Sequence, residues 1–245
     1  MFRFFINSEQ IEDKLLTVEG SDVNHIRNVL RMKAGEDIEA VDENGRVSTC
    51  RIREIQADRI LADLLFSEEN AAELSNRITL YMGLPKFDKM ELVIQKAVEL
   101  GAYRIVPVSM KRCVVKLDPR KAENRVKRWQ SIAESAAKQA KRGLIPEVSS
   151  VISFRDAVKE AGECDHILFP YECAEDISKT RDFLREIKAQ ESVAVFIGPE
   201  GGFDPSEVEA AGDAGAHIIT LGRRILRTET AAITAMSILM FALEK

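Results

Sequence analysis

Two stretches near the end of the chain decide the fold: Ser192–Phe203 (SVAVFIGPEGGF) and Thr220–Ala232 (TLGRRILRTETAA). Each begins with a short apolar run and leaves it through glycine. The run Val193–Ile197 is typical of a strand that is buried on both faces. Because glycine has no Cβ atom, a ligand can lie against the backbone after each run. The pattern predicts either a ligand site at the carboxyl edge of a sheet or two tight strand-to-helix turns.

The residues after the first glycine exit predict the start of a helix. Asp204, Pro205 and Glu207 have the order of an N-cap, a first-turn proline and a capping-box acid. Ile218–Leu221 is the second strand, and Ala231–Leu243 is a helix that is apolar nearly all round, so we expect it to be buried on every side. The dinucleotide motif G-x-G-x-x-G and the Lys-Ser/Thr pair of nucleoside triphosphate loops are absent from the sequence.

From Arg77 onward, strands alternate with helices, which favours an α/β fold with a mostly parallel sheet covered on both faces. A helix closed by Gly101 and a longer helix capped by Asp118 that runs to Gly143 lie between the early strands. Besides the two strands above, we predict strands at residues 77–84, 104–108, 148–152 and 166–169.

Residues 1–70 have the pattern of a small β-barrel with one helix. Asn44 and Gly45 form a hairpin signal between two strand-like runs. A helix capped by Ser21 or Asp22 is expected to run to Met32. The predicted strands are residues 3–6, 14–18, 38–41, 46–55 and 59–66. We therefore expect a first domain at 1–70, a linker at 71–76 and a second domain at 77–245.

Charge is distributed unevenly along the chain. The formal net charge is −5, and residues 1–70 carry nine Lys and Arg against 15 Asp and Glu. Residues 111–142 carry 11 Lys and Arg against three Asp and Glu. Such a segment is either a solvated helix face or a surface that contacts nucleic-acid phosphates.

Composition places the chain among globular proteins, with 45% hydrophobic and 31% charged residues in 245. The four cysteines form no C-x-x-C pair, so we expect free thiols and no metal site. The N-terminus turns acidic before a signal-peptide core could form, and the last helix is too short to cross a bilayer. We therefore expect a cytoplasmic protein with no membrane partner.

Several motifs together resemble the RsmE family, the bacterial 16S rRNA uridine N3-methyltransferases of the SPOUT class. They are GPEGG after an apolar strand and LGRRILRTETA before the last helix, with KFDKMELVIQKAVELGAYRIVPV at Lys86–Val108, RWQSIAESAAKQAKRGLIPEV at Arg128–Val148 and HIRNVLRMKAGE at His25–Glu36. The resemblance covers nearly the whole chain. One position departs from it, because Arg223 stands where relatives often carry proline.

This resemblance implies a PUA-like RNA-binding barrel followed by a SPOUT-like domain whose chain forms a trefoil knot. It implies a homodimer that binds S-adenosylmethionine (SAM), uses no metal, and acts on 16S rRNA in the small ribosomal subunit or a late assembly particle. The implied cofactor-binding residues are Phe169, Pro170, Glu172, Ile197, Gly198, Pro199, Glu200, Gly201, Leu221, Gly222, Ile225, Leu226 and Arg227. The implied RNA-binding residues are Arg27, Arg31, Lys86, Arg112, Arg142 and Arg224.

For the chemistry, we predict that Arg227 stabilises the anion of the uridine ring, with Arg224 as the second choice. Glu229 is the predicted catalytic carboxylate, and Glu200 and Glu172 remain open as proton acceptors. The alternative for Arg227 is a structural ion pair. The alternative for the glutamates at 200 and 229 is favourable charge at the start of a helix.

Two other functions remain open from the sequence. One is a non-catalytic RNA-binding factor in ribosome assembly, whose glycine loops are only turns. The other is a SPOUT-type methyltransferase that acts on a tRNA ribose 2′-hydroxyl group.

Overall fold

A computed structural model describes residues 1–69, 72–174 and 176–244, and the chain divides into two compact units. The first unit is Met1–Glu73 together with Ala137–Leu144, and the second is Leu74–Ala136 together with Ile145–Lys245. The domain boundaries expected from the sequence differ from these units in one respect, since they place residues 137–144 in the second domain. Residue 71 of the expected linker lies outside the described residues.

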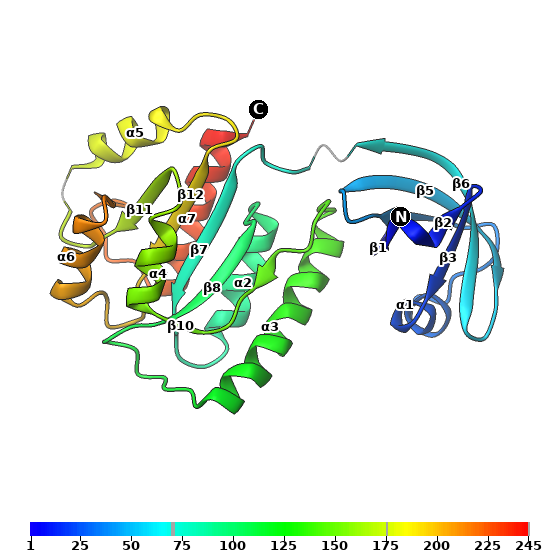
Figure 1. Cartoon of the computed structure of the whole chain (residues 1–245), viewed down its shortest axis with the longest axis horizontal. Helices are drawn as coiled ribbons and strands as arrows, with labels where there is room; N and C mark the ends of the chain where they lie inside the picture. The colour runs from blue at the N-terminus through cyan, green and yellow to red at the C-terminus, as the bar shows by residue number, and fades with distance from the viewer. Residues whose placement is uncertain (70–71, 175, 245) are drawn as a thin grey trace. The chain divides into compact units, whose positions relative to one another are not determined.

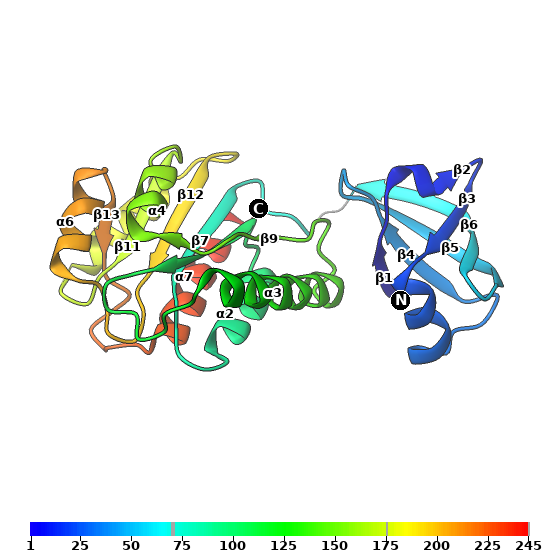
Figure 2. The same ribbon diagram turned by 60° about the horizontal axis from the view of Figure 1, so that its bottom comes forward.

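The first unit is a six-stranded sheet in the order β1-β4-β5-β6-β3-β2 (Figure 2). All its pairs are antiparallel except β1 with β4. Its core includes Phe4, Leu16, Ile38 and Ile60, each at most 1% exposed. The strands are β1 (Phe2–Phe5), β2 (Ile11–Glu12), β3 (Leu15–Glu19), β4 (Asp37–Val41), β5 (Arg46–Ile55) and β6 (Arg59–Glu69), with a 3₁₀ turn η1 (Ser8–Gln10) before β2. The five predicted strands are confirmed, and β2 is an addition.

The predicted helix that runs to Met32 is wrong in its second half. The helix α1 (Ser21–Asn24) passes into a π-helical turn, η2 (His25–Val29), where the N–H of Leu30 donates to the carbonyl of His25 at 2.9 Å. Arg31 then leaves the helix with a positive φ of 54°. Arg27 and Arg31 consequently do not share one helical face, although both are exposed.

The segment 137–144 belongs to the first unit because polar contacts attach it to the sheet there. The guanidinium of Arg142 is 3% exposed and lies 2.7 Å from a carboxylate oxygen of Glu73. Arg3, 8% exposed, donates to the carbonyl of Arg142 at 3.1 Å and lies 2.9 Å from the carboxylate of Glu39. Each of the two buried arginines thus has an acidic partner, as a buried charge requires.

The second unit is a seven-stranded sheet in which every described pair is parallel. The order is β10-β8-β7-β12-β11-β13, and β9 also pairs with β8. The strands are β7 (Arg77–Gly83), β8 (Arg104–Ser109), β9 (Glu147–Val148), β10 (Ile152–Ser153), β11 (His166–Pro170), β12 (Ser192–Ile197) and β13 (His217–Ile219). The predicted parallel sheet is confirmed. The single strand predicted at 148–152 is wrong, because two short strands pair with opposite ends of β8.

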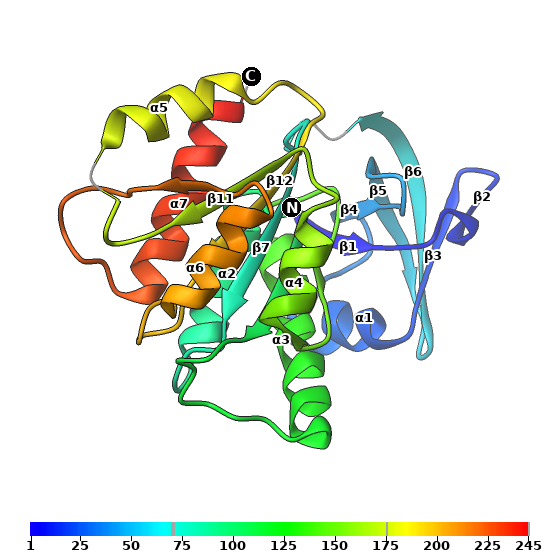
Figure 3. The ribbon, with the colours of Figure 1, turned by 60° about the vertical axis from the view of Figure 1, so that its left-hand side comes forward.

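Helices cover both faces of this sheet (Figures 1 and 3). The helices α2 and α7 pack against each other on one face, and α4 and α6 lie on the other. The bounds are α2 (Lys89–Glu99), α3 (Pro119–Gln139), α4 (Phe154–Ala161), α5 (Ile177–Glu186), α6 (Pro205–Asp213) and α7 (Thr228–Leu243). The expectation that the last helix is buried on every side is wrong within one chain. Met236 and Leu239 are fully buried, whereas Phe241 is 84% exposed.

The strand β12 lies at the centre of the sheet, as its apolar run predicts. Its residues Val193–Ile197 are at most 2% exposed, and Phe196 stacks on Tyr81 of β7 with ring centroids 4.6 Å apart. Since β7, β12, β11 and β13 run parallel, their carboxyl ends meet at one edge of the sheet. The trefoil knot that the family resemblance implies stays a prediction.

Gly83, at the end of β7, allows the loop after β12 to approach closely. A Cβ atom at Gly83 would lie 2.7 Å from the backbone nitrogen of Pro199 and 2.9 Å from the sulfur of Met110. We expect Gly83→Ala to lower the free energy of unfolding by about 1–3 kcal/mol, because the loop must move. Urea denaturation measures this change.

Gly212→Ala is the matched control, because Gly212 lies in α6 and no heavy atom surrounds the added Cβ within 4 Å. This variant should gain about 0.5–1 kcal/mol from helix propensity. Equal effects at the two glycines would contradict the assignment of a tight approach at Gly83.

Candidate active site

Three loops converge at the carboxyl edge of the parallel sheet and surround a cavity of about 430 Å³. They follow β11 (Pro170–Glu172), β12 (Gly198–Phe203) and β13 (Thr220–Arg227). Lys89 of α2 and Ala231 of α7 complete the lining. The volume lies within the range of small-molecule sites, roughly 300–1,000 Å³. The sequence prediction that the glycine exits share one edge is therefore confirmed.

Most of the predicted cofactor residues lie around this cavity. Phe169 does not, since it is fully buried and its ring lies 4.1 Å from that of Phe203. Gly201 also lies outside the lining, and its carbonyl accepts a hydrogen bond from Arg112. The predicted residues that line the cavity are Pro170, Glu172, Ile197, Gly198, Pro199, Glu200, Leu221, Gly222, Ile225, Leu226 and Arg227.

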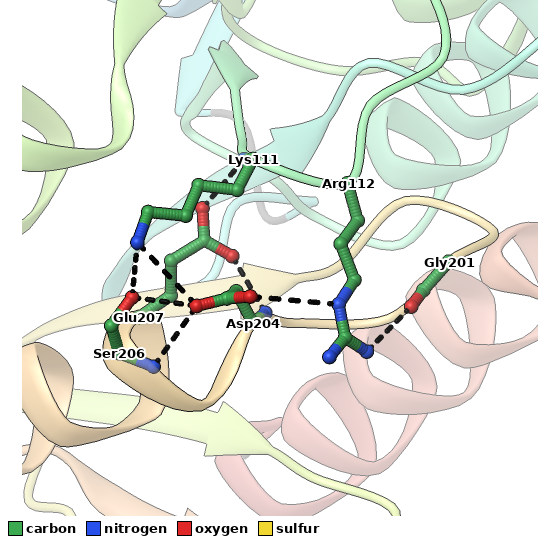
Figure 4. A network of polar contacts seen from close by, with 6 residues as sticks. All are labelled: Lys111, Arg112, Gly201, Asp204, Ser206 and Glu207. Carbon is green, nitrogen blue, oxygen red and sulfur yellow. Dashed lines mark hydrogen bonds and ion pairs between the residues drawn. The ribbon is translucent and has the colours of Figure 1, made fainter.

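A network around the start of α6 holds the loop after β12 in place (Figure 4). Asp204 and Glu207 form the predicted capping box, with the N–H of Asp204 donating to Glu207 at 2.9 Å. The backbone N–H of Lys111, after β8, donates to the other oxygen of Glu207 at 2.8 Å. Arg112 donates to the carbonyl of Gly201 at 3.1 Å. The loop is thus fixed from both sides.

Backbone groups at the cavity are arranged for a ligand. No hydrogen bond among the described residues uses the backbone N–H groups of Leu221 and Leu226. Gly222 has a φ of 120°, and a Cβ atom there would meet nothing within 4 Å. The hydroxyl of Thr228 donates to the carbonyl of Gly198 at 2.6 Å, which ties the start of α7 to the end of β12. Free amides beside apolar walls fit a flat, neutral heterocycle.

Lys89 is the residue at this site that sequence reasoning missed. Its ammonium group lies 3.3 Å from the carboxylate of Glu200 and 3.1 Å from that of Glu229. A signal existed, because Lys89 is the first residue of α2, where a positive charge opposes the helix dipole. A cation in that position indicates a partner elsewhere in the fold.

Titration behaviour follows from these contacts. The contact with Glu229 is the main reason that the pKa of Lys89 is raised. Burial raises the pKa of both Glu229 and Glu200, but hydrogen bonds from backbone amides and the charge of Lys89 outweigh burial, and the pKa of each carboxyl lies below its ordinary value. All three groups are therefore charged at neutral pH. This favours a structural role for Glu229, whose predicted catalytic role stays untested.

Arg227 and Arg224 line the cavity and remain exposed. Among the described residues, no ion pair within 4 Å and no hydrogen bond engages the side chain of either arginine. The structural ion pair considered for Arg227 is thus not observed in this part of the chain. Glu172, exposed at the cavity, has no ion pair there either.

The remaining predicted RNA contacts differ in their surroundings. Arg27 and Arg31 are exposed in the first unit, and Arg112 is partly exposed beside the glycine loop. Lys86 is half-buried, and its backbone N–H donates to Glu200 at 2.9 Å. The prediction for Arg142 is corrected, because a guanidinium that is 3% exposed and paired with an acid cannot face RNA.

Two searches of the described residues gave no candidates. No helix in residues 1–69, 72–174 and 176–244 is long and apolar enough to span a bilayer. No group of three or more His, Cys, Asp or Glu side chains in the same ranges could hold a metal ion.

The comparisons place this geometry in a family. Residues 72–240 match the model of an RNA methyltransferase domain, and residues 18–65 match an RNA methyltransferase PUA domain. The chain is therefore a member of the RNA methyltransferases that carry an N-terminal PUA domain. Within that class, it is 34% identical to ribosomal RNA small subunit methyltransferase E of Bacillus subtilis, over 100% of this chain and 98% of the relative. The chain belongs to the ribosomal RNA small subunit methyltransferase E (RsmE) family, as the motifs predict.

Solved structures agree with this assignment. The methyltransferase E of Neisseria gonorrhoeae, bound to S-adenosyl methionine, superimposes with a TM-score of 0.82 at 32% identity, over 98% of this chain and 96% of that one. A methyltransferase structure from Legionella pneumophila, in complex with bound SAM, gives a TM-score of 0.87 at 31% identity, over 98% and 97% of the two chains.

The ion pairs of Lys89 predict a pH-dependent contribution to stability. Lys89→Met should lower the free energy of unfolding at pH 7 by about 1–3 kcal/mol, between the values for exposed and buried pairs, because two carboxylates lose their cation. The pKa values of the carboxyls are lowered on folding, so this contribution is present above about pH 4.3 and disappears as the pH falls through the lowered values. The raised pKa of Lys89 keeps the contribution present up to about pH 10.

Urea denaturation of both proteins between pH 3 and pH 9 measures this difference. Lys96→Met is the control, since Lys96 lies on the same helix and pairs only with the nearby Glu99 among the described residues. A stability difference for Lys89→Met that persists undiminished at pH 3 would contradict the ion-pair explanation.

Proposed function

We propose that this protein transfers a methyl group from SAM to the N3 atom of a uridine in the 16S rRNA of the small ribosomal subunit. The observation that carries the proposal is the single cavity formed by the loops after β11, β12 and β13, in a chain of the RsmE family. The SAM-bound relatives with the same fold support the choice of donor.

The residues at the cavity fit SAM without a phosphate-binding loop. The amides of Leu221 and Leu226 can bind the edge of the adenine, and Ile197 and Ile225 supply apolar surface. Glu172 places negative charge where a sulfonium cation and an ammonium group would lie. When bound, SAM supplies an activated methyl group, and the protein has to align it with the acceptor atom.

Arg227 is the residue that we assign to the acceptor base. The N3 atom of uridine carries a proton at neutral pH, and its loss leaves negative charge on the ring carbonyl oxygens. An arginine that points at those oxygens stabilises that charge. Arg227 is exposed at the cavity and precedes the first turn of α7, and no ion pair with the described residues occupies it.

Glu172 is the better candidate for the proton acceptor. Lys89 neutralises Glu200 and Glu229, and their lowered pKa values make them weak bases. Glu172 lies in the loop after β11, on the rim of the same cavity, without an ion pair in the described ranges.

Arg227→Ala should reduce turnover on 16S rRNA by about 10²-fold or more, because the developing charge loses its donor. The affinity for SAM should stay within a few-fold, as measured by calorimetry. Arg223→Ala is the matched control, because Arg223 is exposed in the same loop but does not line the cavity. Near-normal methylation by the purified Arg227→Ala protein would refute the assignment.

We further propose that the protein acts as a homodimer through the outer face of α7. Met240 and Phe241 lie on the side of α7 away from its buried residues, and Phe241 is 84% exposed. An apolar helix face of this kind fits a second copy of the chain. A dimer of this type could complete the active site, and we place the protein in the cytoplasm, with its ribosomal substrate.

Phe241→Asp should convert the dimer to a monomer in sedimentation, because it places a charge in an apolar interface. Val29→Asp, at another exposed apolar side chain, should leave the assembly unchanged. A wild-type protein that sediments as a monomer with full activity would contradict the dimer.

The whole proposal is tested by mass-spectrometric mapping of ribosomal RNA from cells with and without the gene. Loss of one N3-methyluridine from 16S rRNA is the expected result. A lost ribose methylation in tRNA would favour the other methyltransferase, and an unchanged modification pattern would favour a non-catalytic factor.

A further inference from the structure

Phe87 has an unusual conformation beside the cavity. Its side chain is 83% exposed, and its φ is +55°, a region that bulky side chains rarely adopt. The neighbouring contacts fix its position, since the N–H of Lys86 donates to Glu200 at 2.9 Å and Lys89 lines the cavity. A strained, exposed aromatic residue at a catalytic pocket indicates a functional contact.

The segment 111–128 of the same unit is strongly basic at its surface. Its eight basic side chains are all exposed: Lys111, Arg112, Lys116, Arg120, Lys121, Arg125, Lys127 and Arg128. Only two acids accompany them, and these pair locally, Asp118 with Lys121 and Glu123 with Lys127. Among the described residues, no ion pair or hydrogen bond engages the side chains of Lys116, Arg120 and Arg125.

Contacts within the second unit join this basic segment to the cavity and to Phe87. At one end, Arg112 donates to the carbonyl of Gly201 in the loop after β12. Further along α3, Arg128 lies 2.9 Å from Glu91, which is one helical turn from Phe87 at the start of α2. Phe87 therefore lies between the cavity and the basic face of α3.

We propose that Phe87 and the basic face of residues 111–128 form a single-stranded RNA track, in which Phe87 stacks on a base next to the target uridine and the arginines of α3 bind the phosphates. Stacking on an aromatic ring next to a positively charged surface is how proteins hold unpaired nucleotides. The inference rests on the proposed function, because it gives the route by which the substrate reaches the cavity.

A second copy of the chain is a poorer occupant of this track. Two surfaces that each carry eight basic and two acidic side chains would repel each other across a symmetric interface. A polyanion matches this charge, whereas the apolar side of α7 lacks it.

The test measures binding of the full-length protein to a fluorescent single-stranded RNA at several salt concentrations. Phe87→Leu keeps an apolar side chain but removes the aromatic face, and we expect a roughly 5- to 100-fold weaker binding. Phe87→Tyr should restore binding to within about three-fold, since it keeps the ring. The double variant Arg120→Ala with Arg125→Ala should lower the slope of log K against log salt by about 1.4, close to 0.7 per phosphate contact.

Arg155→Ala with Arg181→Ala is the charge-matched control, because both arginines are exposed on α4 and α5, away from the track. Calorimetry with SAM and urea denaturation should show unchanged cofactor affinity and folding for all variants. Wild-type RNA affinity in Phe87→Leu, or an α3 salt slope equal to that of the control, would overturn the proposal. Dissociation of the Phe87→Leu protein into monomers would also overturn it, by assigning Phe87 to a subunit interface.

These outcomes are separate from those of the proposed function. A wild-type protein that binds RNA along this track but leaves 16S rRNA unmethylated would refute the proposed reaction, whereas a wild-type protein that methylates 16S rRNA normally while all track variants behave like it would refute only the track.

Discussion

Parallel hydrogen bonding of β12 to both β7 and β11 is the constraint on which the site depends. It brings the ends of strands that are far apart in the sequence to one edge, with Ile197 beside Met82 and the exit of β11 one strand further along. The same pairing buries β12 completely, which its apolar sequence requires. The cavity at this edge is consequently a product of the sheet, and its loops need only be held in place.

Lys89 links three elements that the sheet alone would leave independent. It joins the start of α2 to Glu200 of the loop after β12 and to Glu229 in the first turn of α7. Thr228 adds a neutral contact to the same loop through the carbonyl of Gly198. The anion-binding end of α7 and the glycine loop are therefore fixed with their charges already balanced, which leaves Arg224 and Arg227 available to a ligand.

The sequence predicted the parallel sheet, the convergence of the loops and the family, because apolar runs, glycine exits and capping residues act locally. It failed where a residue depends on a distant partner. Lys89 and the buried Arg142 were misjudged because their acidic partners lie far away in the chain. The end of the helix at Arg31 was missed because a π-helical turn has no distinct composition. The exposed Phe241 shows that an apolar helix can owe its sequence to something outside its own chain.

The discontinuous composition of the first unit has a consequence for biosynthesis and inheritance. Residues 137–144, with the buried Arg142, belong to the same unit as Met1–Glu73. During translation, Glu73 has to wait for nearly seventy further residues before its partner Arg142 leaves the ribosome. For the same reason, genetic recombination that moved only the N-terminal coding region would transfer a sheet without one of its anchors.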